Sequence, residues 1–126
     1  MGDRCNVTAH VWTEDRDSFV DILGEPEQET EDKNTPGIIS LEYADANYAL
    51  CDEIANASAA GLHFVAYNSE GDNYGRGIAA NHGSEYVTID TNRDGTPVVT
   101  VPIDNNELAT ALEAIKLTKR ILSKED

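Results

Sequence analysis

Residues 85–126 read EYVTIDTNRDGTPVVTVPIDNNELATALEAIKLTKRILSKED. Two runs rich in β-branched residues, 86–90 and 97–103, flank the pair Asp94 and Gly95. An Asp-Gly pair between such runs predicts a β-hairpin, because glycine adopts a positive φ without steric cost. We therefore expect two antiparallel strands here, with prolines at the ends of the second strand.

The pattern after this hairpin is helical. Asp104 and Glu107 have the spacing of a capping box, which marks the start of a helix. Apolar residues then recur at helical spacing and predict a long amphipathic helix whose apolar stripe packs on a sheet. The stripe consists of Leu108, Ala111, Leu112, Ile115, Ile121 and Leu122.

The rest of the chain predicts alternating strands and helices. The expected elements are a strand over 5–12, a short helix over 15–24, a strand over 38–43, a helix over 45–60 and a strand over 62–67. The fold class is α+β: one domain over residues 1–126, with a mixed or antiparallel sheet of about five strands. Two main helices are expected to lie mainly on one face of this sheet.

Two segments are expected to be loops. Residues 25–37 begin with a run of acids and contain few apolar side chains, which is typical of a mobile, solvated segment. Residues 68–83 contain four glycines and are expected to form a glycine-rich loop, with room for a brief strand at 77–80.

Net charge is the most informative property of the composition. The chain carries a formal charge of −15, and residues 1–32 hold ten acids and only two bases. Such an excess repels nucleic-acid phosphates and anionic lipids, and it attracts basic partners. No apolar run is long enough to cross a bilayer, so a cytoplasmic location is expected.

The leading functional hypothesis is a small, acidic, non-enzymatic protein that binds and neutralises a basic protein. Immunity proteins that block toxins and phage-encoded inhibitors act in this way, in some cases by mimicking nucleic acid; the analogy is one of class only. The partner is expected to be a toxin or another nucleic-acid-binding protein, met by carboxylates and by two aromatic anchors. The expected contact residues are Trp12, Glu14, Asp15, Asp17, Glu25, Glu27, Glu29, Glu31, Asp32 and Tyr43.

Two alternatives stay open. The acidity is equally expected of a structural or regulatory domain adapted to high salt, where it serves hydration and solubility. A third hypothesis is a small-ligand-binding domain that uses the glycine-rich loop, with Asn73, Tyr74 and Arg76 around an anionic ligand. Either a monomer or a homodimer fits these hypotheses.

Metal and cofactor signals are weak. Asp90, Asn92 and Asp94 match the first half of a calcium loop, but Val101 stands where a bidentate carboxylate belongs. An ordinary turn is therefore the better interpretation, and no metal or cofactor is expected.

Histidines, cysteines and serines give no catalytic signature either. The three histidines have no zinc-type spacing, and His82 with Ser84 lacks the Gly-x-Ser-x-Gly motif of a nucleophile. Cys5 and Cys51 are expected to be reduced. We therefore expect a protein without enzymatic activity.

Overall fold

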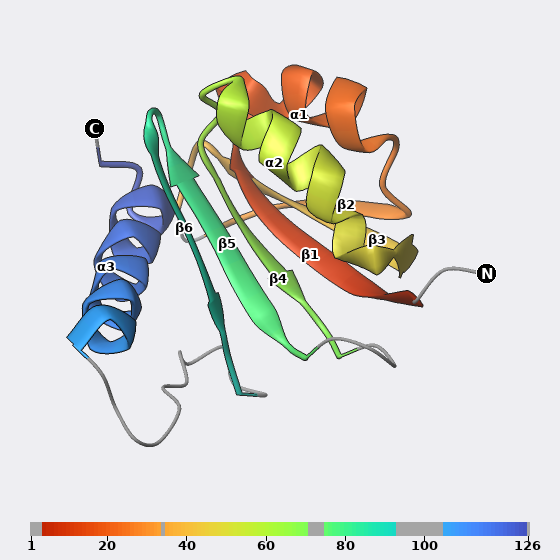
Figure 1. Ribbon diagram of the computed structural model, residues 1–126. Helices are drawn as coiled ribbons and strands as arrows, with labels where there is room; N and C mark the ends of the chain where they lie inside the picture. Colours follow the sequence, from red (N-terminus) through yellow and green to blue (C-terminus); the bar gives the residue numbers. More distant parts are fainter. Residues whose placement is uncertain (1–3, 34, 71–74, 93–104, 126) are drawn as a thin grey trace.

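The computed structural model describes residues 4–33, 35–70, 75–92 and 105–125 (Figure 1). In these residues the chain forms one antiparallel sheet of six strands and three α-helices. The predicted α+β class is confirmed, with one strand more than expected.

The strands run antiparallel throughout, and the first and fourth lie in the middle of the sheet. The spatial order is β2-β3-β1-β4-β5-β6. The bounds are Arg4–Trp12 for β1, Gln28–Glu31 for β2, Ile38–Asn47 for β3, Phe64–Asn68 for β4, Gly77–His82 for β5 and Glu85–Asp90 for β6. The strand predicted near 62–67 is thus confirmed as an interior strand.

Helices cover both faces of the sheet, so the prediction of helices mainly on one face is wrong. α1 (Arg16–Leu23) and α2 (Cys51–Ala59) lie on one face, and α3 (Asn105–Leu122) lies on the other (Figure 1). Short 3₁₀ turns, η1 (Thr13–Asp15) and η2 (Tyr48–Leu50), precede α1 and α2.

Each face of the sheet has its own apolar core. Phe19 of α1 packs with Phe64 of β4 in the first core, at a ring-centroid distance of 5.2 Å. Val65, the next residue of β4, belongs to the second core with Ile121 of α3. Successive side chains of a strand point to opposite faces, and β4 is apolar on both because both faces are covered.

Both expected loops contain a strand. β2 lies within residues 25–37, where all four strand residues are exposed, so it carries no apolar alternation to reveal it. β5 lies within residues 68–83 and is longer than the brief strand considered there. Its glycine, alanine and asparagine residues have low β-propensity, and the strand is fixed by pairing with β4 on one side and β6 on the other.

The helix expected over 45–60 begins later, at Cys51, because β3 continues to Asn47. Between these elements Ala49 and Leu50 both have φ of 56°. The left-handed conformation is unusual for residues with a Cβ. It turns the chain abruptly from β3 into α2.

The hairpin that precedes α3 in the described residues joins β5 to β6. It turns at Gly83, which has φ of +64°. The second arm of the predicted hairpin, residues 97–103, lies outside the described residues, as does Asp94 of its turn.

The buried face of α3 differs from the predicted stripe. Ala111, Ala114, Leu117 and Ile121 are buried and Leu122 packs partly buried beside them, so Ala111, Ile121 and Leu122 of the expected stripe are confirmed, whereas its other three side chains are exposed. The exposed ones are Leu108 at 46%, Leu112 at 50% and Ile115 at 38%. The buried face therefore combines two alanines with the larger side chains of Leu117 and Ile121.

No described helix is long and apolar enough to cross a membrane.

Candidate binding surface

The acidic edge consists of Glu25, Glu27, Glu29 and Glu31, which lie in and beside β2. All four side chains are exposed. Among the described strands, β2 pairs with β3 alone and is the last strand on this side of the sheet. Glu29 is opposite Leu41, whose side chain is buried in the core beneath α1 and α2. Because side chains alternate along a strand, the glutamates of β2 point to the same face as α1.

Arg16 connects α1 to this edge. Its Nε and Nη2 atoms donate to Glu29 Oε1 at 3.0 and 2.7 Å, and its Nη1 donates to Asp17 Oδ1 at 3.0 Å. The hydrogen bonds that Arg16 donates raise its pKa, and those to Glu29 contribute more than the one to Asp17. One guanidinium therefore orients two of the predicted contact carboxylates.

Glu27 has a structural role within the edge. Its backbone N–H donates to Glu42 O at 2.8 Å, and its Oε2 accepts from the backbone N–H of Ala44 at 2.8 Å. The side chain therefore holds the start of β2 against β3. Among the described residues, the side chains of Glu25, Glu29 and Glu31 accept no hydrogen bond from a backbone N–H, so these three are the better candidates for contact with a partner.

Tyr43 lies beneath the edge rather than on it. The ring is 6% exposed, and its hydroxyl donates to Gly24 O at 2.9 Å. Burial raises the pKa of Tyr43 to about 12, and nearby Glu25 and Glu27 add to the rise. The exposure that an anchor role for Tyr43 requires is therefore absent, and the side chain instead supports the segment that carries the glutamates.

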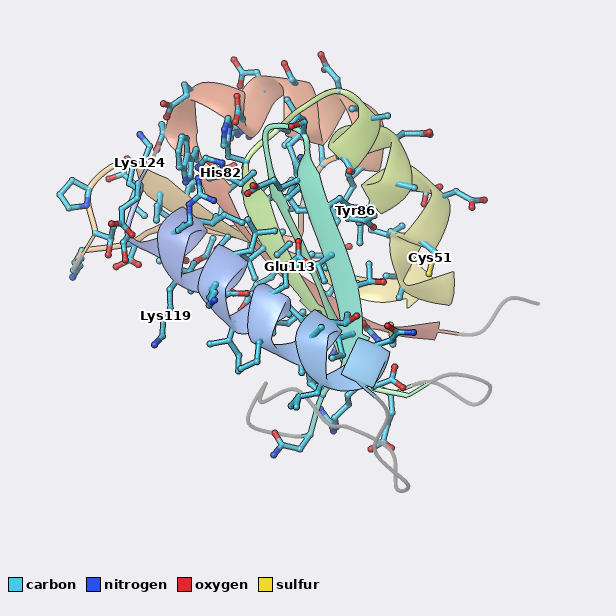
Figure 2. All side chains as sticks on the ribbon, turned by 60° about the vertical axis from the view of Figure 1, so that its left-hand side comes forward. Cys51, His82, Tyr86, Glu113, Lys119 and Lys124 are labelled. Carbon is cyan, nitrogen blue, oxygen red and sulfur yellow. The ribbon has the colours of Figure 1, made fainter. Side chains whose placement is uncertain are left out.

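Trp12 is also buried, at 4% exposure, so a partner cannot contact the second predicted anchor on this surface. Its indole stacks on His63 at 4.0 Å between ring centroids, and Nε1 donates to Ile121 O at 2.8 Å. The Lys124 ammonium lies 5.1 Å from the indole centroid. These contacts fix the C-terminal end of α3 against the sheet. Figure 2 shows His82 and Lys124 together at this end of the helix.

Glu14 and Asp15, two further predicted contact residues, belong to the same cluster. Asp15 Oδ2 accepts from the backbone N–H of His63 at 2.8 Å and pairs with its Nδ1 at 2.9 Å. Glu14 pairs with Lys124 at 2.8 Å, and this hydrogen bond lowers the pKa of Glu14. Both carboxylates are therefore engaged in this cluster, as Glu27 and Glu29 of the acidic edge are engaged with Ala44 and Arg16.

Two pairings were not foreseen from the sequence. His10 Nδ1 lies 2.8 Å from Ser40 Oγ, because these residues are directly opposite in β1 and β3. Burial lowers the pKa of His10, with nearby Asp32 acting in the opposite sense. The imidazole is thus a neutral cross-strand partner. The His63–Asp15 pair is the second case, and in both the partners are known only once the register is known.

The residues proposed for an anionic ligand do not form a basic site in the described chain. Arg76 Nη2 lies 3.4 Å from Glu70 Oε1, so the positive charge of Arg76 is paired with the carboxylate of Glu70. Asn73 and Tyr74 lie outside the described residues.

The calcium-like turn and the thiols gain no metal partners in the described part of the chain. Asp90 ends β6 and Asn92 follows it, but Asp94 lies outside the described residues. Among described residues, no three His, Cys, Asp or Glu side chains are grouped as a metal site requires. Cys5 is buried and Cys51 is exposed, and both are free thiols.

Comparison with known proteins gives no match to a protein-family model, a curated protein or a solved structure. The acidic edge is therefore interpreted from its own charge and geometry.

Proposed function

We propose that this protein is a non-enzymatic binding protein that holds a basic segment of a partner protein along the acidic edge. The observation that carries the proposal is β2 itself. It is an edge strand with every residue exposed, and its glutamates alternate along one face. The backbone groups on the outer side of an edge strand are free to pair with an added strand.

Charge supports a basic partner. Residues 1–32, which include α1 and all of β2, hold ten acids against two bases. The cations Lys116 and Lys119 lie on α3, which packs on β4 to β6, the three strands at the end of the sheet away from β2. The molecule is therefore most negative around β2, and this asymmetry would orient a basic partner during encounter.

The spacing of the glutamates gives the edge a second property. Alternate residues of a strand are roughly 6.7 Å apart, so Glu27, Glu29 and Glu31 form a regular line of negative charge. A groove that binds a nucleic-acid backbone presents cations to such a line. We infer that the partner is a protein whose basic groove or basic strand normally meets phosphates, and that this protein acts as its inhibitor.

A defined peptide tests the proposal. The probe is a capped decapeptide of alternating valine and lysine, titrated into the labelled protein while amide signals and amide hydrogen exchange are followed by NMR. The expected result is that β2 amides shift first and that exchange of Gln28–Glu31 slows, because an added strand protects the outward-facing amides. An alternating valine–glutamate peptide is the charge control and is expected not to bind.

Two variants of equal net charge locate the effect. Each replaces three acids by their amides, so that side-chain size and one acceptor oxygen are kept while three of the fifteen net negative charges are lost. The edge variant contains Glu25→Gln, Glu29→Gln and Glu31→Gln. The control variant contains Asp52→Asn, Glu53→Gln and Glu113→Gln, in α2 and α3.

The peptide is expected to bind the edge variant about tenfold more weakly than the parent, and the control variant less than about threefold more weakly. Equal weakening of the two variants would mean that net charge alone attracts the peptide, and the proposal would then be abandoned. Shifts centred away from β2 would count against it as well.

A further inference from the structure

A cavity of about 540 Å³ opens at the end of the sheet away from β2, between the start of α2 and the strands β4, β5 and β6. Its walls include Ile54 of α2 and Tyr86 of β6, while Cys51 stands at the first residue of α2. Figure 2 shows Cys51 at the start of α2 and Tyr86 on the sheet. The volume lies in the range of small-molecule sites, about 300–1,000 Å³.

The register of the strands explains why the cavity exists. Ala66, Ala79 and Thr88 are directly opposite one another across β4, β5 and β6, and Gly77 occupies the next row of β5 on the same face. Three of these four side chains are no larger than a methyl group. Because α2 packs beside α1 rather than over β5 and β6, nothing larger fills the space above this floor in the described residues.

One end of the cavity carries hydrogen-bond acceptors. Asn68, Gly77 and Asp90 are opposite one another in a single row, so the amide and the carboxylate stand on either side of a residue without a side chain. Strand spacing puts their Cα atoms roughly 9.5 Å apart. Asn68 Nδ2 donates to Ser69 O at 2.9 Å and to Gly75 O at 3.0 Å. Its two hydrogens are thus used, and its Oδ1 lies over Gly77, 3.0 Å from where a Cβ would stand.

The charge of this cavity is negative. Asp90 is the one charged residue among the described lining residues. Cys51 contributes no charge, because partial burial and the nearby Asp52 raise the pKa of its thiol. An anionic ligand would meet a carboxylate without a compensating base, whereas a protonated amine would donate hydrogen bonds to both acceptors.

We propose that this cavity binds a small organic amine, with an apolar body over the alanine floor and a protonated amino group between Asn68 and Asp90. The proposal replaces the anionic ligand expected from the sequence. It is independent of the acidic edge, since β2 is at the opposite end of the sheet and contributes no described lining residue.

Three probes with one common body test the chemistry. They are phenethylamine, 2-phenylethanol and 3-phenylpropanoate, each titrated into the full chain with binding followed through the amide signals of Gly77 and Ala79. Phenethylamine is expected to bind about tenfold more tightly than the alcohol, the ratio that a charge-assisted hydrogen bond supplies, and the carboxylate is expected to bind most weakly.

Three variants then locate the site. Asp90→Asn is expected to bring the amine to the affinity of the alcohol while leaving the alcohol unchanged. In Ala79→Leu the larger side chain projects into the cavity, and this variant is expected to bind neither the amine nor the alcohol. Asp52→Asn, with the same change of charge outside the lining, is expected to change neither by more than about twofold. If Ala79→Leu does not fold, the comparison of amine binding by Asp90→Asn and Asp52→Asn still tests the proposed site.

Three results would overturn the proposal. The first is no signal change up to about 10 mM phenethylamine, a concentration that would nearly saturate a site with a Kd of about 1 mM. The second is equal affinity for the amine and the carboxylate. The third is equal loss of amine binding in Asp90→Asn and Asp52→Asn, which would assign the attraction to net charge rather than to the cavity.

Discussion

Replacing Asn81 by leucine is expected to destabilise the protein strongly. Asn81 is fully buried and is a polar residue in the core. Its Nδ2 donates to Leu62 O at 2.7 Å and to Gly83 O at 3.1 Å, and its Oδ1 accepts from Ser58 Oγ at 2.7 Å. One amide therefore joins the end of α2, the segment before β4 and the turn between β5 and β6.

The magnitude follows from how buried each lost partner is. Leu62 O lies in a buried hydrogen bond, and leaving it without a donor costs about 2 kcal/mol. Gly83 O and Ser58 Oγ are partly buried and can reach water, so each lost hydrogen bond costs about 1 kcal/mol. The apolar leucine side chain offsets about 1 kcal/mol of this sum. The expected decrease in the free energy of unfolding is thus about 3 kcal/mol.

Urea unfolding followed by far-ultraviolet circular dichroism measures this decrease, and the melting temperature is expected to fall by about 10 °C. Ser58→Ala is the matched control, because it removes one of the three hydrogen bonds and leaves the amide in place. It is expected to cost about 1 kcal/mol. A decrease below about 1 kcal/mol for Asn81→Leu would refute the reasoning, since the buried carbonyl alone exceeds that value.

Three further predictions concern the rest of the fold. Trp12→Phe keeps a ring beside His63 but loses the hydrogen bond to Ile121 O and much of the contact with Lys124, so urea unfolding should show a loss of about 2 kcal/mol; an unchanged stability would contradict this. Because the folded chain lowers the pKa of His10 below its ordinary 6.5, the unfolded chain binds more protons, and stability should fall as pH decreases below about 6.5. His10→Gln should show a smaller loss between pH 7 and pH 5 than the parent, and an equal loss would remove His10 as its source. With a net charge of −15, the melting temperature should rise by a few degrees from about 20 mM to about 1 M potassium chloride, whereas a gain of tens of degrees would assign the acidity to a high-salt habitat rather than to a partner.

Local patterns in the sequence predict some elements well. β1 has clear alternation, β4 is nearly continuous in apolar residues, and α3 has helical spacing; each of these was predicted and is present. These signals come from residues within one element, so they do not depend on partners elsewhere in the chain.

Other elements depend on neighbours that a local pattern does not specify. β2 is a strand because it pairs with β3, although its side chains are all exposed, and β5 is a strand because two neighbours pair with it. The orientation of α3 also depends on its contacts with the sheet: Ala111 and Ala114 are buried while Leu112 is exposed, although all three are apolar.

The candidate sites divide in the same way. The acidic run around β2 is visible in the sequence, because four alternating glutamates are themselves a pattern. The row of Asn68, Gly77 and Asp90 is not visible, because residues separated by 9 and 13 positions become neighbours only through the register of three strands. Trp12 and Tyr43 are expected from the sequence to act as anchors on the condition that they are exposed, and their burial depends on what packs over them.

The bond from Trp12 to Ile121 O joins residues 109 positions apart and has a consequence for synthesis on the ribosome. β1 to β6 leave the ribosome before α3. The sheet face that carries Val65, Ile78 and Val87 therefore stays uncovered until α3 has been synthesised and can pack on it. At about 5–20 residues per second the interval between Val87 and Ile121 lasts roughly 2–7 s. During this time a nascent chain presents an apolar surface to chaperones and to other nascent chains, and the second core closes only after most of the chain has been translated.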